Sequence, residues 1–167
     1  MSMIQEVTKT TEGYPRFSDG RINYTNERVC YVLNYVVISG DEVLLTKRGA
    51  DVIAYPNTIN GASGFIDDTS KTLGEMAGIE LVEELDAPLD RLKSLRIGEP
   101  LTQIDDEINR EWHVYPALAE FVTEFAPKAN WENKSAEWFS IGNVPGMELM
   151  RGFLKTFQVA IKLRNTK

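Results

Sequence analysis

The sequence predicts one α+β domain in which a mixed β-sheet lies between helices. Segments rich in β-branched and aromatic residues run along most of the chain, and two segments with helical apolar spacing are set among them. The length of 167 residues suits one domain. Apolar residues at 43% and charged residues at 26% are typical of a globular chain with its own core.

The predicted strands are bounded by turn signals such as Gly40-Asp41. In chain order they are residues 28–39, 42–47, 92–97, 112–122 and 137–141. The first two are close enough together to form a hairpin. Pro116 lies inside the fourth, and because proline donates no backbone hydrogen bond, that strand is expected at an edge or at a bulge.

Two helices are predicted from apolar periodicity and from the residues at their ends. The first, residues 72–85, stops just before Pro88. The second covers residues 147–163, and its apolar side chains recur at i, i+4, i+7 and i+11. These positions are Met150, Leu154, Phe157 and Ile161.

The remaining segments are expected to be irregular. Residues 1–28 are polar with scattered turn signals, and we interpret them as an extension packed on the domain formed by residues 29–167. Residues 49–63 are predicted to form a loop, and the acidic run within residues 99–107 is predicted to be a solvated loop.

Composition and charge restrict the partners of the chain. Its 25 acidic and 18 basic residues give a net charge of −7 without a basic run, so a nucleic-acid duplex is not an expected partner. No stretch approaches the ~20 apolar residues that cross a bilayer, so no membrane partner is expected. Cys30 is the only cysteine and the first residues lack an apolar leader segment, which favours the cytoplasm.

The first predicted helix carries carboxylates on the side that faces the sheet. At about 100° per residue, its apolar arc consists of Leu73, Ala77, Leu81 and Leu85. Glu84 falls inside this arc, and Glu80 and Glu83 flank it. Carboxylates at i, i+3 and i+4 repel one another and lose hydration when buried, unless a cation compensates them. Oxygen ligands suit Mg²⁺ or Mn²⁺. The alternative, a solvated acidic face, stays open.

The same helix carries a resemblance to a known family. Residues 64–87, GFIDDTSKTLGEMAGIELVEELDA, resemble the Nudix box, G-x5-E-x7-R-E-U-x-E-E-x-G-U with U a bulky aliphatic residue. The E-U-x-E-E core is matched by Glu80, Leu81, Glu83 and Glu84. The departures are Phe65 at the first glycine (with Gly64 just before it), Lys71 at the upstream glutamate, Ile79 at the arginine, Asp86 at the late glycine and Ala87 at the last aliphatic position.

The resemblance extends over roughly residues 29–165. The segment VCYVLNYVVISGDEVLLTKRG is similar to the hairpin that precedes the box, and AEWFSIGNVP is similar to the segment that precedes the last helix. The resemblance implies an α/β/α sandwich with a mixed sheet. It also implies a hydrolase, dependent on Mg²⁺ or Mn²⁺, that cleaves the pyrophosphate of a nucleoside diphosphate linked to another moiety.

Site residues follow from the same resemblance. Glu83 and Glu84 would be metal ligands, and Glu80 a ligand or a catalytic residue that orients them. Glu132, five residues before Glu137, would be a further ligand or the general base. Arg48 matches a family position that often faces the phosphates, with a structural ion pair as the alternative, and Gly64 matches the glycine that often precedes the box. Phe65 is a candidate to stack on a nucleobase, with core packing as the alternative. These three are the predicted substrate-binding residues. Asp67 and Asp68 are candidates to replace the glutamate that Lys71 displaces.

Two other functions remain open. The changes in the box favour a catalytically impaired domain that binds a nucleotide or a protein, while the complete set of Glu80, Glu83 and Glu84 favours the hydrolase. An isomerase of isopentenyl-diphosphate type shares the fold, but its chemistry resembles one that uses a cysteine before the box, and residues 55–64 contain none. The expected partner is a small nucleotide diphosphate, with a homodimer left open.

Overall fold

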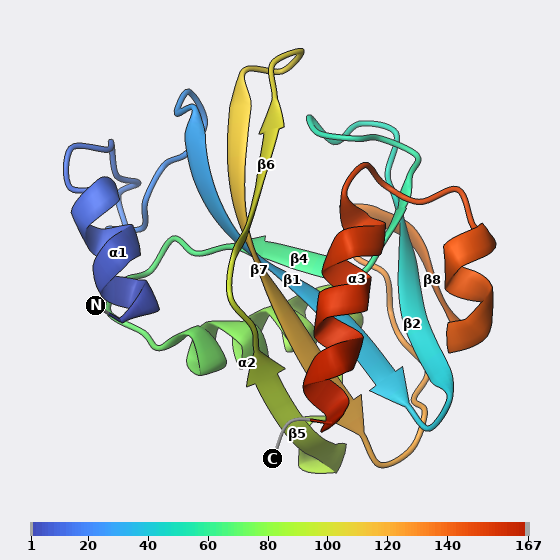
Figure 1. The fold of residues 1–167 in the computed structure, drawn as a ribbon. Helices are drawn as coiled ribbons and strands as arrows, with labels where there is room; N and C mark the ends of the chain where they lie inside the picture. The colour runs from blue at the N-terminus through green and yellow to red at the C-terminus, as the bar shows by residue number, and fades with distance from the viewer. Residues whose placement is uncertain (1, 166–167) are drawn as a thin grey trace.

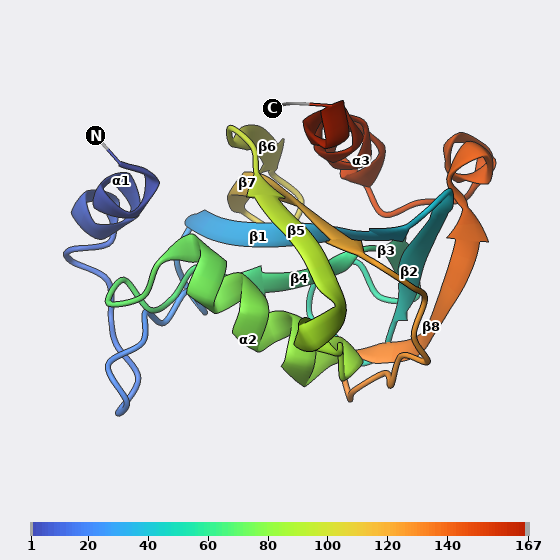
Figure 2. The same ribbon diagram turned by 90° about the horizontal axis from the view of Figure 1, so that it is seen from below.

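Helices cover both faces of one mixed β-sheet in the computed structural model, which describes residues 2–165 (Figure 1). Figure 2 shows the sheet nearly on edge, with α2 (Leu73–Leu85) on one face and α3 (Phe153–Lys162) on the other. The strands are β1 (Val29–Ser39), β2 (Glu42–Arg48), β3 (Ile59–Asn60), β4 (Ala62–Phe65), β5 (Leu92–Ile97), β6 (Leu101–Asp105), β7 (Arg110–Phe121) and β8 (Asn133–Ser140). The predicted fold class is confirmed. Within residues 2–165, no helix combines the length and apolar content that a membrane span needs.

Strand β1 is central because it is paired along both edges. On one edge it runs parallel to β7, from Val29 opposite Glu111 to Ile38 opposite Glu120. On the other edge, its first half pairs with β4 and its second half with β2, both antiparallel. Strand β2 also pairs with β3 and β8, so the sheet divides on this side. Strand β4 leads from this division into the loop before α2.

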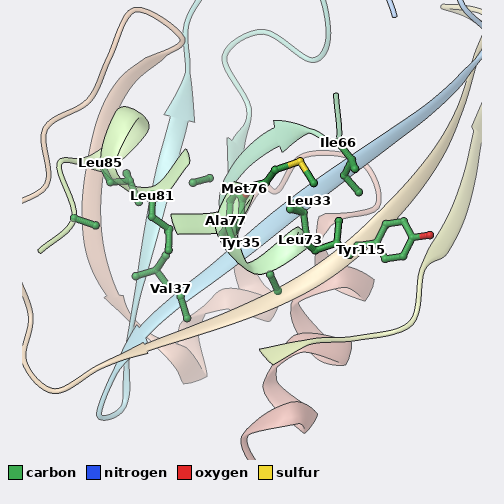
Figure 3. Packing of buried hydrophobic residues seen from close by; sticks show 14 of the residues in the cluster. Leu33, Tyr35, Val37, Ile66, Leu73, Met76, Ala77, Leu81, Leu85 and Tyr115 are labelled. Carbon is green, nitrogen blue, oxygen red and sulfur yellow. The ribbon is translucent and has the colours of Figure 1, made fainter. Parts of the chain in front are cut away.

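The core lies in two layers, because β1 alternates its side chains between the two faces of the sheet. Leu33, Tyr35 and Val37 pack toward α2, whereas Val36 and Ile38 belong to the cluster beneath α3. Figure 3 shows the first layer. The predicted apolar arc of α2 is confirmed, since its members are at most 5% exposed: Leu73, Ala77, Leu81 and Leu85.

The N-terminal segment has more structure than its composition indicates. Residues Met3–Thr10 form α1, a helix that the sequence did not predict and that begins with a capping box between Ser2 and Gln5. Val7, Ile22 and Tyr24 are buried and belong to the same core layer as α2. The extension is therefore part of the packed core.

Two predicted loops contain strands. Residues 49–63 include β3 and the beginning of β4, and the acidic run includes β6, which pairs with the first half of β7. Asp106 and Glu107 are exposed as predicted, but Asp105 is 2% exposed, since it accepts a hydrogen bond from the Tyr55 hydroxyl and pairs with Arg151. A buried carboxylate with two partners does not follow the rule that acidic runs are solvated.

The last helix begins six residues later than predicted. Leu149 forms a parallel bridge with Ile59, and the backbone amide of Met150 donates to the Ile59 carbonyl, so this segment is extended against β3. Gly152, at φ +81°, then turns the chain into α3. Long-range pairing therefore overrides the helical periodicity of residues 147–152.

Pro116 lies in the interior of the sheet, so the expected edge position is wrong. Strand β7 separates β1 from two shorter strands, β5 and β6. Pro116 lies at the gap between these two, where β5 ends opposite Ala117 and β6 begins opposite Val114. A residue without a backbone N–H is tolerated there because no ladder hydrogen bond is required of it.

Candidate functional site

Helix α2 presents its carboxylates at fixed positions because both of its ends are defined. The Thr72 hydroxyl accepts a hydrogen bond from the Glu75 amide at 3.2 Å, and the Glu75 carboxylate accepts one from the Thr72 amide at 2.8 Å. Asp86, in the left-handed conformation, ends the helix. Glu84 is 4% exposed, Glu80 is partly buried and Glu83 is exposed.

Glu84 is a buried carboxylate with weak partners. Its Oε2 accepts long hydrogen bonds from the Ser63 amide at 3.4 Å and from the Asn133 side chain at 3.5 Å. Burial raises its pKa well above the usual range, and the nearby charges of Glu132 and Glu80 add to this. The negative charge of Glu84 is therefore not balanced by its protein surroundings.

Glu80 lies against strand β4. A Cβ atom on Gly64 would lie only 2.5 Å from the Glu80 carboxyl carbon, so the absence of a side chain at Gly64 makes room for this carboxylate. Burial raises the pKa of Glu80 to about 7, and repulsion from Glu83, Asp67 and Glu132 contributes. Without a bound cation, the charged form of Glu80 is therefore disfavoured near neutral pH.

Glu132 approaches the same region from the loop before β8. Its carbonyl accepts a hydrogen bond from the Gly49 amide at 2.7 Å, which ties this loop to the end of β2. Burial raises the pKa of Glu132, and the neighbouring Arg48 lowers it. Burial in turn lowers the pKa of Arg48, while the charges of Glu132 and Glu84 raise it. Arg48 is therefore the cation beside this end of the carboxylate group, and its Nε also donates to the Ala54 carbonyl at 2.9 Å.

Other residues at the site were not among the predicted ligands. The Tyr35 hydroxyl is buried without a hydrogen-bond partner among the described residues. Burial is the main cause that raises the pKa of Tyr35 well above its usual range. The negative charges of Glu80, Glu84 and Asp67 raise it further. Asn133 donates to Glu84. Nothing in the sequence marks either residue as part of a site. A tyrosine in an apolar strand, such as Tyr35, normally indicates core packing.

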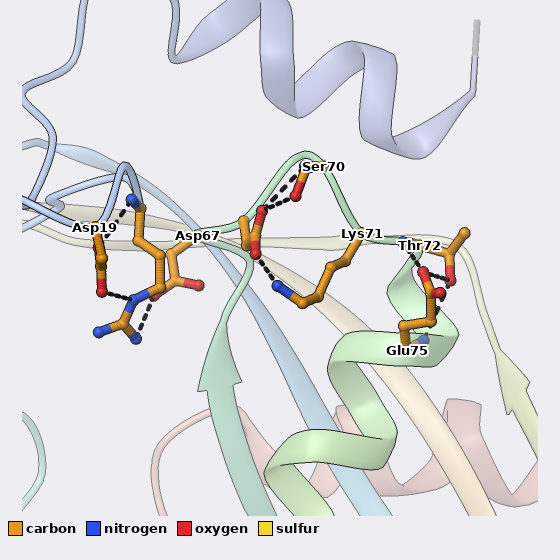
Figure 4. Close-up of polar contacts among 8 residues, drawn as sticks. Asp19, Asp67, Ser70, Lys71, Thr72 and Glu75 are labelled. Atoms are coloured by element: carbon orange, nitrogen blue, oxygen red, sulfur yellow. Dashed lines mark hydrogen bonds and ion pairs between the residues drawn. The ribbon is translucent and has the colours of Figure 1, made fainter.

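Lys71 and Ile79, at two altered box positions, do not join the carboxylates. Lys71 forms an ion pair with Asp68, and this hydrogen bond, with that of Ser70, lowers the pKa of Asp68 to about 2 (Figure 4). Ile79 is 42% exposed. Asp67, by contrast, is half-buried and acts on Glu80. Of the two candidate replacements, Asp67 is therefore the one beside the site.

Phe65 lies next to Gly64 but belongs to an aromatic stack. Its ring stacks on Tyr24 with a centroid distance of 5.2 Å and an interplanar angle of 17°. The Trp112 ring is tilted relative to the Phe65 ring, with a centroid distance of 6.3 Å. Phe65 is nevertheless 43% exposed, so part of its ring is accessible. The predicted role in substrate binding stays a prediction.

The chemistry of the carboxylate group fits a divalent cation. The donors are oxygen atoms of Glu80, Glu84 and Glu132, with Glu83 and Asp67 beside them, and such a set suits Mg²⁺ or Mn²⁺. Within residues 2–165, no three carboxylate, imidazole or thiol groups are already arranged as ion ligands. The predicted convergence of Glu80, Glu83 and Glu84 on one ion therefore stays a prediction.

A shallow pocket of about 290 Å³ lies elsewhere, between β6 and the start of α3. Its lining includes Leu101, Val114, Arg151 and Lys155, and no carboxylate. It therefore offers no anionic ligand for a hard cation, and the group on α2 is the better candidate site.

The sequence matches no protein-family model and no curated protein. The structure resembles the NUDIX domain of Shewanella oneidensis NrtR, complexed with ADP ribose, with a TM-score of 0.68 at 14% identity. This match covers 99% of the present chain and 100% of that chain. An Ap4A hydrolase of C. elegans gives a TM-score of 0.62 at 14% identity, over 81% of this chain and 97% of that one.

A third structure is a bifunctional NMN adenylyltransferase/ADP ribose pyrophosphatase from Francisella tularensis, complexed with AMP and a Mn ion. Its TM-score is 0.64 at 14% identity, over 96% of this chain and 45% of that chain. The chain has the Nudix fold. In this Nudix fold, residues 64–87 form the end of β4, the following loop and α2, so the box-like stretch includes both Gly64 and the glutamates that lie against it.

Proposed function

We propose that this protein is a pyrophosphohydrolase, dependent on Mg²⁺ or Mn²⁺, that cleaves a nucleoside diphosphate linked to another moiety. The observation that carries the proposal is the burial of Glu84, together with the partial burial of Glu80 and Glu132, around one region of a Nudix fold. Their pKa values are all raised by burial, so together they lack the positive charge that would stabilise them ionised.

The similar structures support the class of substrate. One was solved with ADP ribose and another with AMP and a Mn ion, and both compounds are of nucleotide type. The fold and the acidic group are therefore consistent with an anionic substrate that is bound through a divalent cation. A chain of net charge −7 repels such a substrate unless local positive charge compensates.

In this proposal, Glu80, Glu83 and Glu84 would hold the cation. When bound, it would supply charge neutralisation on the pyrophosphate and a lower pKa for water. Glu132 accepts the proton of the attacking water, because a carboxylate with a raised pKa is the stronger base. Arg48 partly offsets this rise in the pKa of Glu132, and we propose that it also contacts the phosphates.

A panel of nucleoside diphosphate derivatives tests the proposal. Wild-type protein with Mg²⁺ or Mn²⁺ is expected to release a nucleoside monophosphate from at least one member, detected by chromatography. Glu84→Gln removes the innermost charge with little change in volume and is expected to abolish release. Glu75→Gln makes the same chemical change in the first turn of α2, where glutamine still completes the capping box, and is expected to retain activity.

The changes at Lys71 and Ile79 favour one alternative, a domain that binds nucleotides without hydrolysing them. The Lys71 ion pair with Asp68 removes one candidate carboxylate from the site, and Ile79 brings no cation to it. Binding of a panel member without turnover, in the presence of either cation, would favour this alternative over the hydrolase.

A further inference from the structure

Positive charge beside the carboxylates of α2 must come from other segments. Helix α2, LGEMAGIELVEEL, contains no basic residue. Arg48 provides one cation, next to Glu84 and Glu132. A second cation is Arg21 of the N-terminal extension, whose charge lowers the pKa of Glu80. The pKa of Arg21 is in turn raised by Asp19 and Asp67 and, to a smaller extent, by Glu83. Arg48 therefore acts on Glu84 and Glu132, whereas Arg21 acts on Glu80 and Glu83 and is in contact with Asp67.

The extension brings Arg21 to this place through specific backbone contacts. The segment around it folds back on itself, with Arg16 and Ile22 forming an antiparallel bridge. The Ile22 amide donates to the Asp67 carbonyl at 2.8 Å, and the Tyr24 hydroxyl donates to the Ile66 carbonyl at 2.8 Å. Because Ile22 and Tyr24 are buried, the position of Arg21 relative to the loop before α2 is fixed.

The guanidinium of Arg21 is held in one orientation. Its Nε donates to Asp19 Oδ2 at 2.8 Å, and its backbone amide donates to Asp19 Oδ1 at 3.1 Å. Its Nη1 lies 3.4 Å from Asp67 Oδ2, and its Cζ lies 5.9 Å from the centre of the Phe17 ring. Figure 4 shows the contacts that join Asp19 and Asp67 through this side chain. The Arg21 side chain is nevertheless 52% exposed.

The exposed ion pairs of Arg21 contribute too little to stability to explain why its side chain is held in one orientation. Pairs of this kind contribute about 0–1 kcal/mol, and Asp67 is held in the fold by backbone contacts in any case. A guanidinium has five N–H donors in a planar fork that matches two oxygens of a phosphate. The contacts to Asp19 and Asp67 use Nε and Nη1, and no hydrogen bond from Nη2 is found within residues 2–165, so this nitrogen still has donors for a phosphate.

We propose that Arg21 is a substrate-binding residue, and that its guanidinium contacts a phosphate group at the Asp67 end of the site. This inference rests on the proposed function, since it assigns the residue that receives one end of the pyrophosphate. Arg48 acts on the other two carboxylates, Glu84 and Glu132. The two arginines together compensate the charge of a diphosphate that the acidic residues alone would repel.

Imidodiphosphate is a pyrophosphate analogue that carries no nucleoside, so it tests the role of Arg21 independently of nucleoside specificity. With Mg²⁺ present, calorimetry is expected to show binding to wild-type protein. Arg21→Ala is expected to weaken binding by about tenfold or more, the usual effect of losing a charged hydrogen bond. Arg21→Lys keeps the charge but not the fork and should fall between the two. On a turned-over substrate, KM should rise more than kcat falls.

The matched control is Arg28→Ala. Arg28 is also in the extension and 42% exposed, and it pairs with Asp106 and Asn109 away from the carboxylates. It is expected to bind imidodiphosphate as wild type does. Unchanged binding in Arg21→Ala, with a functional wild type, would overturn this inference and leave the proposed function intact. A loss of binding that merely follows a lowered melting temperature would also overturn it. Absence of both binding and turnover in wild type would overturn the proposed function itself.

Discussion

Glu80 shows at one residue how burial couples stability to pH. Its pKa is about 7 because burial disfavours the charged form, and Glu83 and Asp67 add repulsion. Glutamates of the unfolded chain titrate near about 4.3. The folded state therefore binds the Glu80 proton more tightly than the unfolded chain does. The contribution of this proton to the free energy of unfolding is complete below about pH 4 and is lost as the pH rises through about 7.

For protein without metal, we expect the free energy of unfolding to fall by roughly 2 kcal/mol between about pH 5 and about pH 8 through Glu80, a value reduced for its partial exposure. Urea denaturation in the presence of a chelator measures this change. Glu80→Gln should make the dependence shallower, and Glu84 and Glu132, whose pKa values burial also raises, account for what remains. Glu75→Gln should not, since capping hydrogen bonds lower the pKa of Glu75 and its titration lies below this range. Equal slopes in wild type and Glu80→Gln would contradict the account.

Gly64 tests the closeness of β4 and α2. In Gly64→Ala, the new methyl group would lie 2.5 Å from the Glu80 carboxyl carbon, so the carboxylate must turn away while the backbone stays in place. We expect at least about a tenfold loss of activity, which is the usual effect of disturbing a residue that orients a metal ligand. The melting temperature should change little. Gly78→Ala is the matched control, because its methyl group would meet only Leu89 at an ordinary 3.7 Å. Similar activity in both variants would show that Glu80 is not positioned by Gly64.

At the scale of elements, helix α2 is stabilised by one buried face. Leu81 is 0% exposed and Val82, its neighbour, is 43% exposed. Leu81→Ala is expected to lower the free energy of unfolding by about 2–5 kcal/mol, and Val82→Ala by about 0.5 kcal/mol or less. Urea denaturation compares the two, and a similar loss in both would mean that α2 does not pack through the predicted arc.

The elements that could be predicted are those with a local cause. Residues 72–85 carry an N-cap, an apolar arc and a following proline, and they form α2 almost to the residue. Strand β1 has a long run of β-branched and aromatic residues. Strands β4 and β6 are short and contain Gly64 or charged residues, so they depend on pairing with β1 and β7. The late start of α3 likewise depends on the bridge between Ile59 and Leu149.

At the scale of the whole molecule, the site combines segments that are distant in the sequence. That the α2 glutamates and Glu132 lie near one another could be predicted, because the box pattern and its spacing to the E-W segment are visible in one chain, while their role as ligands stays a prediction. Tyr35, Asn133 and Arg21 could not, since each reaches the carboxylates only through strand pairing or through packing of the extension. Their residue types alone have no distinguishing pattern.

The extension is expected to unfold together with the domain. Ile22 is 1% exposed in the same core layer as α2. Ile22→Ala should therefore lower the free energy of unfolding by about 2–4 kcal/mol in a single transition. Tryptophan fluorescence and far-UV circular dichroism should give coincident urea curves. An early separate transition would show that the extension is an independent unit and that Arg21 is not held at the site by the core.

The central claim is that the buried glutamates of α2 bind a divalent cation. Titration of Mn²⁺, followed by the loss of its free electron paramagnetic resonance signal, measures this directly in wild type, Glu84→Gln and Glu75→Gln. The account predicts a bound ion in wild type and Glu75→Gln, and an affinity at least about tenfold lower in Glu84→Gln, since a charged ligand is removed. Equal Mn²⁺ affinity in all three proteins, or no binding in wild type, would contradict it.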